Sequence, residues 1–170
     1  NFALQGTMIS EIGREEWESV SRATLKAAFC CTRAALPQMR KQRQGRLIHL
    51  ISPEAVLGRA GYTHPGAFQM AIVGLSRNAA IEMERSRVTS NCVVSSTRWG
   101  SPSRPEDVAP LVVFLGSDAA QNLTGQIFGV QDKEVTLFSQ SRIQRSIHNS
   151  EGWTVERLSE TFESSMRPYF

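Results

Sequence analysis

Apolar residues recur along this chain in two alternating patterns. Long segments place apolar and small side chains three or four positions apart, which predicts amphipathic helices. Short runs of mainly apolar and β-branched residues lie between them, which predicts strands buried on both faces. The alternation of helix and strand predicts an α/β fold with a doubly wound parallel sheet covered by helices.

The boundaries of the expected elements follow from these patterns and from capping residues. Helices are expected at residues 14–39, 66–84 and 105–116, and strands at residues 46–52, 87–94 and about 125–131. Pro105, followed by two acidic residues, suits the start of the third helix. Pro37 lies inside the first helix and is expected to end or kink it, because proline has no N–H to donate.

The polarity of the chain changes near residue 135. Residues 1–134 are expected to form the α/β domain, and residues 135–170 a polar extension that ends in a short amphipathic helix. Thr154 is placed to cap that helix. Its apolar stripe comprises Val155, Leu158, Phe162 and Met166. The stripe could dock on this subunit or on a neighbouring one.

Charge and composition exclude several classes of function. The net charge is +3, and the densest basic group, Arg40, Lys41 and Arg43, is the pattern of a solvated helix end. No Lys/Arg tract with interleaved aromatic residues indicates nucleic-acid binding. No apolar run reaches the ~20 residues of a membrane span. We therefore expect a soluble, cytoplasmic protein that binds neither nucleic acid nor a membrane.

The three cysteines lie in apolar stretches without metal-ligand spacing. Cys30, Cys31 and Cys92 are expected to be buried thiols in a reducing compartment. No cluster of Asp, Glu and His has the spacing of a zinc or calcium site, so no metal is expected.

Five segments, in this order and spacing, resemble the C-terminal two-thirds of the short-chain dehydrogenase/reductase (SDR) family. They are "EEWESVSRATLKAAFCCTRAALPQM", "GRLIHLIS", "GLSRNAAIEM", "RVTSNCVV" and "PEDVAPLVVFLGSDAAQNLTGQ", and together they span residues 10–132. The resemblance implies a Rossmann-like fold. It also implies that the dinucleotide-binding βαβ part is missing here, because the sequence contains no G-x-x-x-G-x-G turn.

The resemblance further implies where a catalytic set of Asn, Ser, Tyr and Lys should stand. Counted from "GLSR", the family Tyr position is Pro65 and the Lys position is Gln69, while Ser52 is retained and Thr24 replaces the Asn. Pro65 has no proton to exchange, and Gln69 has no charge to lower a neighbouring pKa. We therefore expect no intact catalytic set, with Ser52 a remnant whose hydroxyl satisfies local backbone groups.

Two departures in the later part of the chain agree with this expectation. "NCVVSS" at 91–96 lacks the Pro-Gly that the family usually has beside the nicotinamide, and the substrate-covering segment is reduced to residues 96–105. No bound cofactor is expected in this chain.

A relocated proton donor is the alternative within the same stretch. Tyr62 and His64 lie within three residues of Pro65 and are expected in a loop, but Gly66 stands where a Lys paired with Tyr62 would be. Tyr62 is therefore a weak candidate. His49, inside a strand, is expected to be a satisfied core or edge residue.

The leading hypothesis is a non-catalytic SDR-like subunit. By the resemblance, helices 14–39 and 66–84 are the assembly helices, and they would pair with an active SDR subunit that carries NAD(P), so a hetero-oligomer is favoured over a homo-oligomer. One alternative is an active NAD(P)-dependent oxidoreductase with an atypical proton donor, and another is a stand-alone regulatory or ligand-sensing module.

Overall fold

A parallel sheet forms the centre of the first part of the chain. The computed structural model describes residues 6–95 and 103–167, and in them four strands lie in the order β1-β2-β3-β4. The strands are β1 Gly45–Ile51, β2 Val88–Val94, β3 Ile127–Gln131 and β4 Glu134–Leu137. Strands β1, β2 and β3 are parallel, and β4 returns antiparallel to β3. This is the predicted α/β class, with one added antiparallel strand.

Strand β2 is the most deeply buried element of the sheet. All seven of its residues are buried, and it pairs with β1 along the whole length from Gly45↔Val88 to Ile51↔Val94. In the described part of the chain β1 is an edge strand, and Leu50 on it is 60% exposed. The sheet therefore has a fully covered centre beside an open edge.

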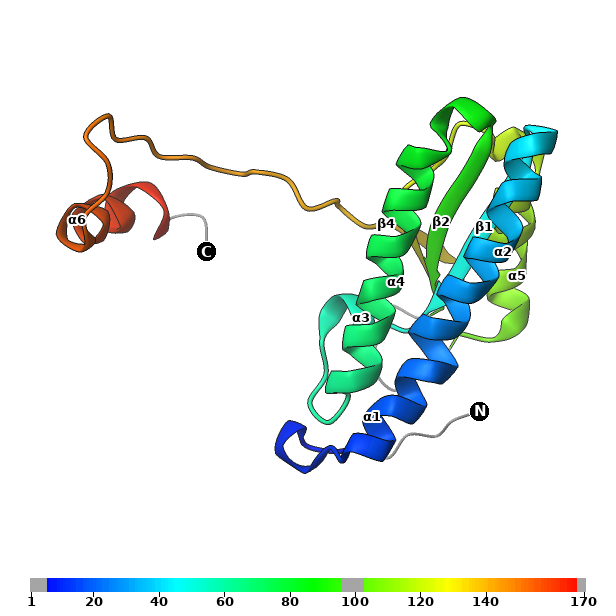
Figure 1. Cartoon of the computed structure of the whole chain (residues 1–170), viewed down its shortest axis with the longest axis horizontal. Helices are drawn as coiled ribbons and strands as arrows, with labels where there is room; N and C mark the ends of the chain where they lie inside the picture. Colours follow the sequence, from blue (N-terminus) through cyan, green and yellow to red (C-terminus); the bar gives the residue numbers. More distant parts are fainter. Residues whose placement is uncertain (1–5, 96–102, 168–170) are drawn as a thin grey trace. The chain divides into compact units, whose positions relative to one another are not determined.

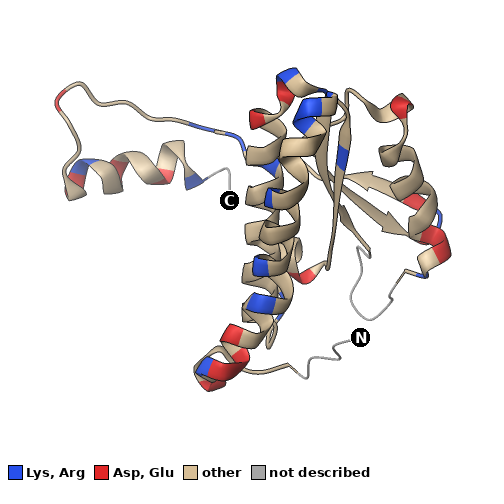
Figure 2. Cartoon of the chain, turned by 45° about the vertical axis from the view of Figure 1, so that its right-hand side comes forward, with Lys and Arg blue, Asp and Glu red and all other residues tan. Residues whose placement is uncertain are grey.

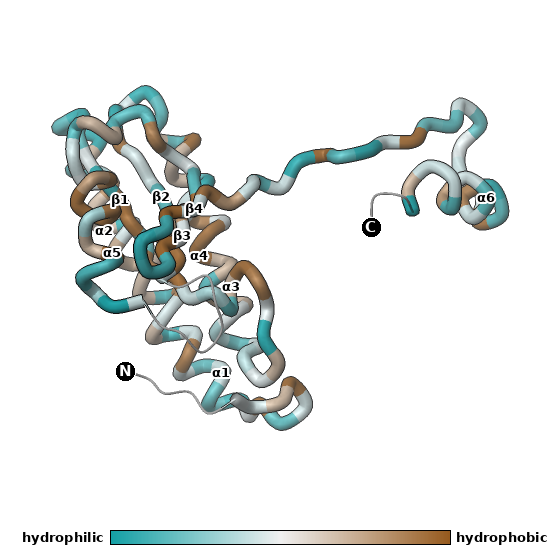
Figure 3. The backbone as a smooth tube through the Cα atoms, turned by 180° about the vertical axis from the view of Figure 1, so that it is seen from behind, coloured by the Kyte–Doolittle hydropathy of each residue, from teal (hydrophilic) through white to brown (hydrophobic). Residues whose placement is uncertain are grey.

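Helices cover both faces of the sheet. Helices α2 (Ala27–Gln42) and α4 (Thr63–Glu82) lie on one face, and α5 (Pro105–Gly116) lies on the other (Figure 1). Successive residues of β2 point to opposite layers: Cys92 and Val94 pack with α4, whereas Val93 packs with α5. Figure 3 shows hydrophobic residues along the strands of the sheet.

The first helical segment has an internal irregularity. It consists of α1 (Arg14–Ser21), a π-helical turn η2 (Arg22–Lys26) and α2. The Trp17 ring on α1 meets the Phe68 ring of α4 edge-on, with centroids 4.6 Å apart. Pro37, which was expected to end or kink the helix, does not end it, because α2 continues to Gln42 and stops where Arg43 takes a left-handed conformation.

Four short helical turns complete the framework of the first part. They are η1 Ile9–Glu11, α3 Glu54–Leu57, η3 Glu84–Ser86 and η4 Asp118–Ala120. The short connection expected at residues 96–105 falls mainly on residues 96–102, outside the described residues.

Two cysteines differ from the sequence expectation. Cys92 on β2 is buried as expected, but Cys30 and Cys31 on α2 are exposed. The neighbouring Ala28 on the same helix does pack against the core, so an apolar stretch of α2 includes both core and exposed positions.

The chain divides into two compact units at Ser139/Gln140. The first unit continues past residue 134, the boundary expected from composition, because β4 adds a strand that ends at Leu137. Among the described residues, no helix is long and apolar enough to cross a membrane.

The second unit contains one helix, α6 (Val155–Ser165). The Thr154 hydroxyl accepts a hydrogen bond from the N–H of Arg157 at 3.3 Å, which confirms the expected cap. Residues 138–149, before the helix, form neither helix nor strand. Val155 and Leu158 on the apolar stripe are exposed.

The layer formed by α5 gives a direct test of the core. Leu115 is fully buried, whereas Val113 on the same helix is 72% exposed. We expect Leu115→Ala to lower the free energy of unfolding by about 3 kcal/mol, because it leaves a cavity in the packed layer. Val113→Ala is the matched control and should change it by less than about 0.5 kcal/mol. Urea denaturation followed by circular dichroism measures both values, and equal losses would contradict this packing.

Candidate functional site

A cavity of about 330 Å³ lies between the edge strand β1 and the helices on one face of the sheet. Its lining comes from η2, α2, β1 and α4: Ala23, Thr24, Ala27, Ala28, Ile48, His49, Leu50, Gln69 and Ile72. Two of the positions that the family resemblance singled out, Thr24 and Gln69, therefore meet in one cavity. Pro65 and Tyr62 are not part of this lining.

Thr24 lies in the π-helical turn η2. Its hydroxyl donates a 2.6 Å hydrogen bond to the carbonyl of Val20 in the preceding turn. Such a bond back to the helix satisfies the hydroxyl locally. π-Helical turns recur at functional sites, but here the Thr24 hydroxyl at that turn is hydrogen-bonded to a backbone carbonyl.

Gln69 connects α4 to the end of β1. Its Oε1 accepts a 2.5 Å hydrogen bond from the backbone N–H of Ser52, the residue directly after the strand. The Ser52 carbonyl accepts a bond from the N–H of Ala55 at 3.2 Å. The side chain that satisfies the backbone at this position is therefore that of Gln69. The sequence had predicted this role for the Ser52 hydroxyl. A neutral amide oxygen suits this role, because it can accept from an N–H without bringing a charge.

Pro65 lies in the first turn of α4. The helix begins at Thr63, three residues earlier than expected, and Pro65 is buried. The first four N–H groups of a helix have no partner within it, so a proline at this position loses no hydrogen bond. Pro65, which the resemblance predicts to stand at the family Tyr position, is therefore a proline well suited to the start of a helix.

The early start of α4 also changes the surroundings of Tyr62 and His64. Tyr62 is half-buried just before the helix, and the Arg59 guanidinium lies 4.4 Å from the centre of its ring. His64 was expected in a loop, but it lies in the first turn of the helix and is 1% exposed. Its Nε2 is 3.2 Å from Oε1 of Glu16 on α1, without the angles of a hydrogen bond. Both residues therefore have structural contacts with their neighbours.

His49 also lines the cavity, and its hydrogen bonding differs from the expectation. It was expected to be satisfied, but its buried Nε2 has no hydrogen-bond partner among the described residues. Burial lowers its pKa, because a low-dielectric environment disfavours the charged imidazolium. No sequence signal distinguishes a satisfied strand histidine from this one, since the difference depends on which residues from η2, α2 and α4 pack beside it.

The residues around this cavity do not fit a dinucleotide. No lining residue is cationic, and small apolar side chains make up most of the wall. A pyrophosphate needs cationic side chains or a helix N-terminus with free N–H groups. We therefore derive no reaction step through NAD(P) from these residues.

Known proteins resemble this chain over most of its first unit. The model of the short chain dehydrogenase family matches residues 3–97. The 3-oxoacyl-[acyl-carrier-protein] reductase FabG of Thermotoga maritima is 26% identical over 144 residues, which cover 72% of this chain and 58% of that protein. The (2S)-[(R)-hydroxy(phenyl)methyl]succinyl-CoA dehydrogenase subunit BbsD of Thauera aromatica is 28% identical over 143 residues, covering 72% and 57%. The chain thus spans less than two-thirds of either relative.

Solved structures show the same fold. A short chain dehydrogenase from Mycobacterium avium superposes with a TM-score of 0.85 and 28% identity, covering 96% of this chain and 60% of that one. The full-length peroxisomal multifunctional enzyme type 2 of Drosophila melanogaster gives a TM-score of 0.85 at 24% identity, covering 96% and 32%. The parallel sheet between two helix layers is therefore Rossmann-like, of the type these proteins have.

The Gln69–Ser52 bond predicts losses of stability of different size for two substitutions. Gln69→Leu removes the acceptor and should lower the free energy of unfolding by about 1 kcal/mol, whereas Gln69→Glu keeps an acceptor oxygen and should retain more of the stability. Thermal denaturation of both variants measures the difference. If Gln69→Leu is as stable as the parent chain, the bond does not connect β1 to α4.

The lowered pKa of His49 predicts a dependence of stability on pH. Above about pH 6.5 His49 is neutral in both the folded and unfolded chain, and as the pH falls below this value the unfolded chain binds the proton first. Stability should therefore fall between about pH 6.5 and the lower pKa of the folded state. Urea midpoints across this range should fall less in His49→Gln than in the parent. His148→Gln, at an exposed position outside the sheet, is the matched control for the exchange of histidine for glutamine.

Proposed function

Because the chain belongs to the short-chain dehydrogenase family, we propose that it is a non-catalytic member that assembles with an active NAD(P)-dependent dehydrogenase or reductase subunit. In that complex it stabilises the partner or completes the partner's site. The observation that carries this proposal is the structural use of the family catalytic positions. Thr24 and Gln69 are hydrogen-bonded to backbone groups, and Pro65 has no group that could exchange a proton.

The outward surface of α4 supports an assembly function. Ala67, Met70, Ala71 and Ile81 recur at helical spacing on this surface and are exposed, Ile81 to 73%. Gly74 lies between them, and a Cβ added there would meet nothing within 4 Å. Small residues of this kind allow another helix to approach closely, and exposed apolar side chains favour covering the surface.

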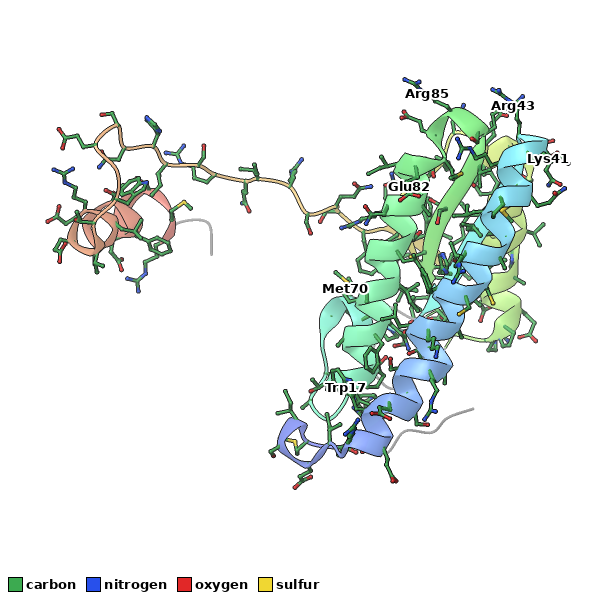
Figure 4. The ribbon with its side chains drawn as sticks, in the orientation of Figure 1. Trp17, Lys41, Arg43, Met70, Glu82 and Arg85 are labelled. Carbon is green, nitrogen blue, oxygen red and sulfur yellow. The ribbon has the colours of Figure 1, made fainter. Side chains whose placement is uncertain are left out.

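The neighbouring helices extend this apolar surface. Trp17 on α1 is 43% exposed and Phe29 on α2 is 47% exposed. Figure 4 shows Trp17 and Met70 on adjoining helices of the same layer. The α1–α2 segment and α4 correspond to residues 14–39 and 66–84, which the family resemblance predicts to be the assembly helices.

A heteromeric partner suits the proposal better than a second copy. A dimer of two such chains would still have no proton donor at the family positions, whereas an active subunit would supply the donor and NAD(P). The Thauera aromatica relative is itself named a dehydrogenase subunit. The cytoplasm is the proposed location, and the substrate would be chosen by the partner.

Co-expression tests the association surface. The chain is co-expressed with an SDR protein encoded beside it, purified by a tag on one subunit, and assayed for NAD(P)-dependent turnover. Ala71→Glu should reduce the recovered partner about tenfold or more, because an unpaired carboxylate would be buried in the interface. Ala109→Glu, an equally simple change at an exposed position on α5, should leave recovery unchanged.

Two results would contradict the proposal. The first is turnover by the isolated chain that disappears on Tyr62→Phe, because it would show a relocated proton donor. The second is a monodisperse monomer that recovers no companion, which would favour a stand-alone module. The double variant Pro65→Tyr and Gln69→Lys should remain inactive without a partner.

A further inference from the structure

A second cavity lies at the other end of the sheet, where β1 and β2 begin. It has a volume of about 570 Å³ and is lined by Gln42, Arg43, Gln44, Arg46, Arg87, Asp118 and Gln121. These residues come from the turns that enter the two strands, from the start of β1 and from the region of η4. The Thr24–Gln69 cavity lies along the later part of β1, so the two cavities share no lining residue.

Positive charge dominates this second cavity. Asp118 is its one acidic lining residue, and its carboxylate is 3.2 Å from Nη2 of Arg46. Arg46 also donates to the carbonyls of Ser117 and Arg87, so its guanidinium is fixed as part of the wall. Three guanidinium groups against one carboxylate leave an excess of two positive charges.

Arg43 and Arg87 have donors left for a ligand. Nη2 of Arg43 donates to the Arg85 carbonyl at 3.3 Å, and Nη2 of Arg87 donates to Oε1 of Gln121 at 2.6 Å. Within residues 6–95 and 103–167, the other N–H groups of these two guanidiniums have no protein partner. Figure 4 shows Arg43 and Arg85 at the same end of the helix layer, where Figure 2 shows both basic and acidic residues.

The backbone conformation of Arg43 and Arg87 is a second, independent observation at this cavity. Arg43 has φ of 52° and Arg87 has φ of 55°, both in the left-handed region that favours glycine. Each ends a helical turn just before a strand, where glycine would be the least strained choice. Of the described residues other than glycine, only Asp132 is also left-handed. Arg43 and Arg87 hold strained backbone conformations on two separate turns, and both line one cavity. This coincidence indicates that the two arginine side chains have a function there.

We propose that this cavity binds a small phosphorylated organic molecule. The phosphate dianion matches the two excess charges and accepts hydrogen bonds from the guanidiniums of Arg43 and Arg87. The amides of Gln42, Gln44 and Gln121 can donate to or accept from the organic part of the ligand. The volume falls within the ~300–1,000 Å³ of small-molecule pockets and exceeds what an inorganic phosphate ion fills.

Calorimetric titration of the full chain at constant ionic strength tests the proposal. Ribose 5-phosphate and adenosine monophosphate are the probes, with inorganic phosphate and unphosphorylated ribose for comparison. We expect saturable 1:1 binding of at least one phosphate ester, about tenfold tighter than inorganic phosphate, and none of ribose. Absence of saturable binding by both esters at millimolar concentration would overturn the proposal.

Glycine variants separate ligand binding from the folded state. Arg43→Gly and Arg87→Gly should each weaken ester binding about tenfold or more, yet raise the thermal midpoint, because glycine relieves the left-handed backbone. Arg33→Gln removes an exposed arginine of α2 outside the cavity and should leave the affinity unchanged. If all three variants lose affinity for the ester equally, or if the glycine variants lose none, the ester binds elsewhere on the surface.

Discussion

The complete burial of β2 is the constraint on which the rest of this structure depends. A strand with no exposed residue needs a neighbour on each edge and a layer on each face. Strand β1 and strand β3 supply the edges, and α4 and α5 supply the faces. Once β2 is enclosed in this way, the helix that links β1 to β2 must lie along the sheet, and the residues between β1 and α4 are brought to the end of the strands.

That arrangement brings the end of β1 and the start of α4 together, at the place where the sequence predicts the family's catalytic positions to stand. Ser52 follows β1, and Gln69 reaches it from α4, so the strand and helix still meet where a Ser–Tyr–Lys set would stand. The bond from an amide oxygen to a backbone N–H holds this junction without a charge. Pro65 starts the helix at no cost in hydrogen bonds. The junction of β1 and α4 is therefore held by a neutral hydrogen bond and by a proline that suits the start of a helix.

Sequence patterns predicted the elements that depend on local periodicity and missed features that depend on distant neighbours. The strands, the helix begun by Pro105 and the Thr154 cap follow from residues close together in the chain, and the structure confirms them. The burial of His64 depends on α1 packing over the start of α4, and the exposure of Cys30 and Cys31 depends on which surface of α2 stays uncovered. The arginine cavity joins residues 42–46, 87 and 118–121, which no local pattern connects. At the candidate site, Gln69 could be singled out from the sequence, whereas its bond to Ser52 depends on how α4 packs against the end of β1.

The open edge of β1 has a consequence for the chain on its own. The strand has the apolar sequence of a sheet interior, yet its outer row of backbone N–H and C=O groups faces no strand among the described residues. Such a row is a template on which another extended chain can pair, and β1 carries none of the lysines, prolines or bulges that usually discourage pairing. An extended segment added along β1 would satisfy these backbone groups and turn this edge of the described sheet into part of its interior.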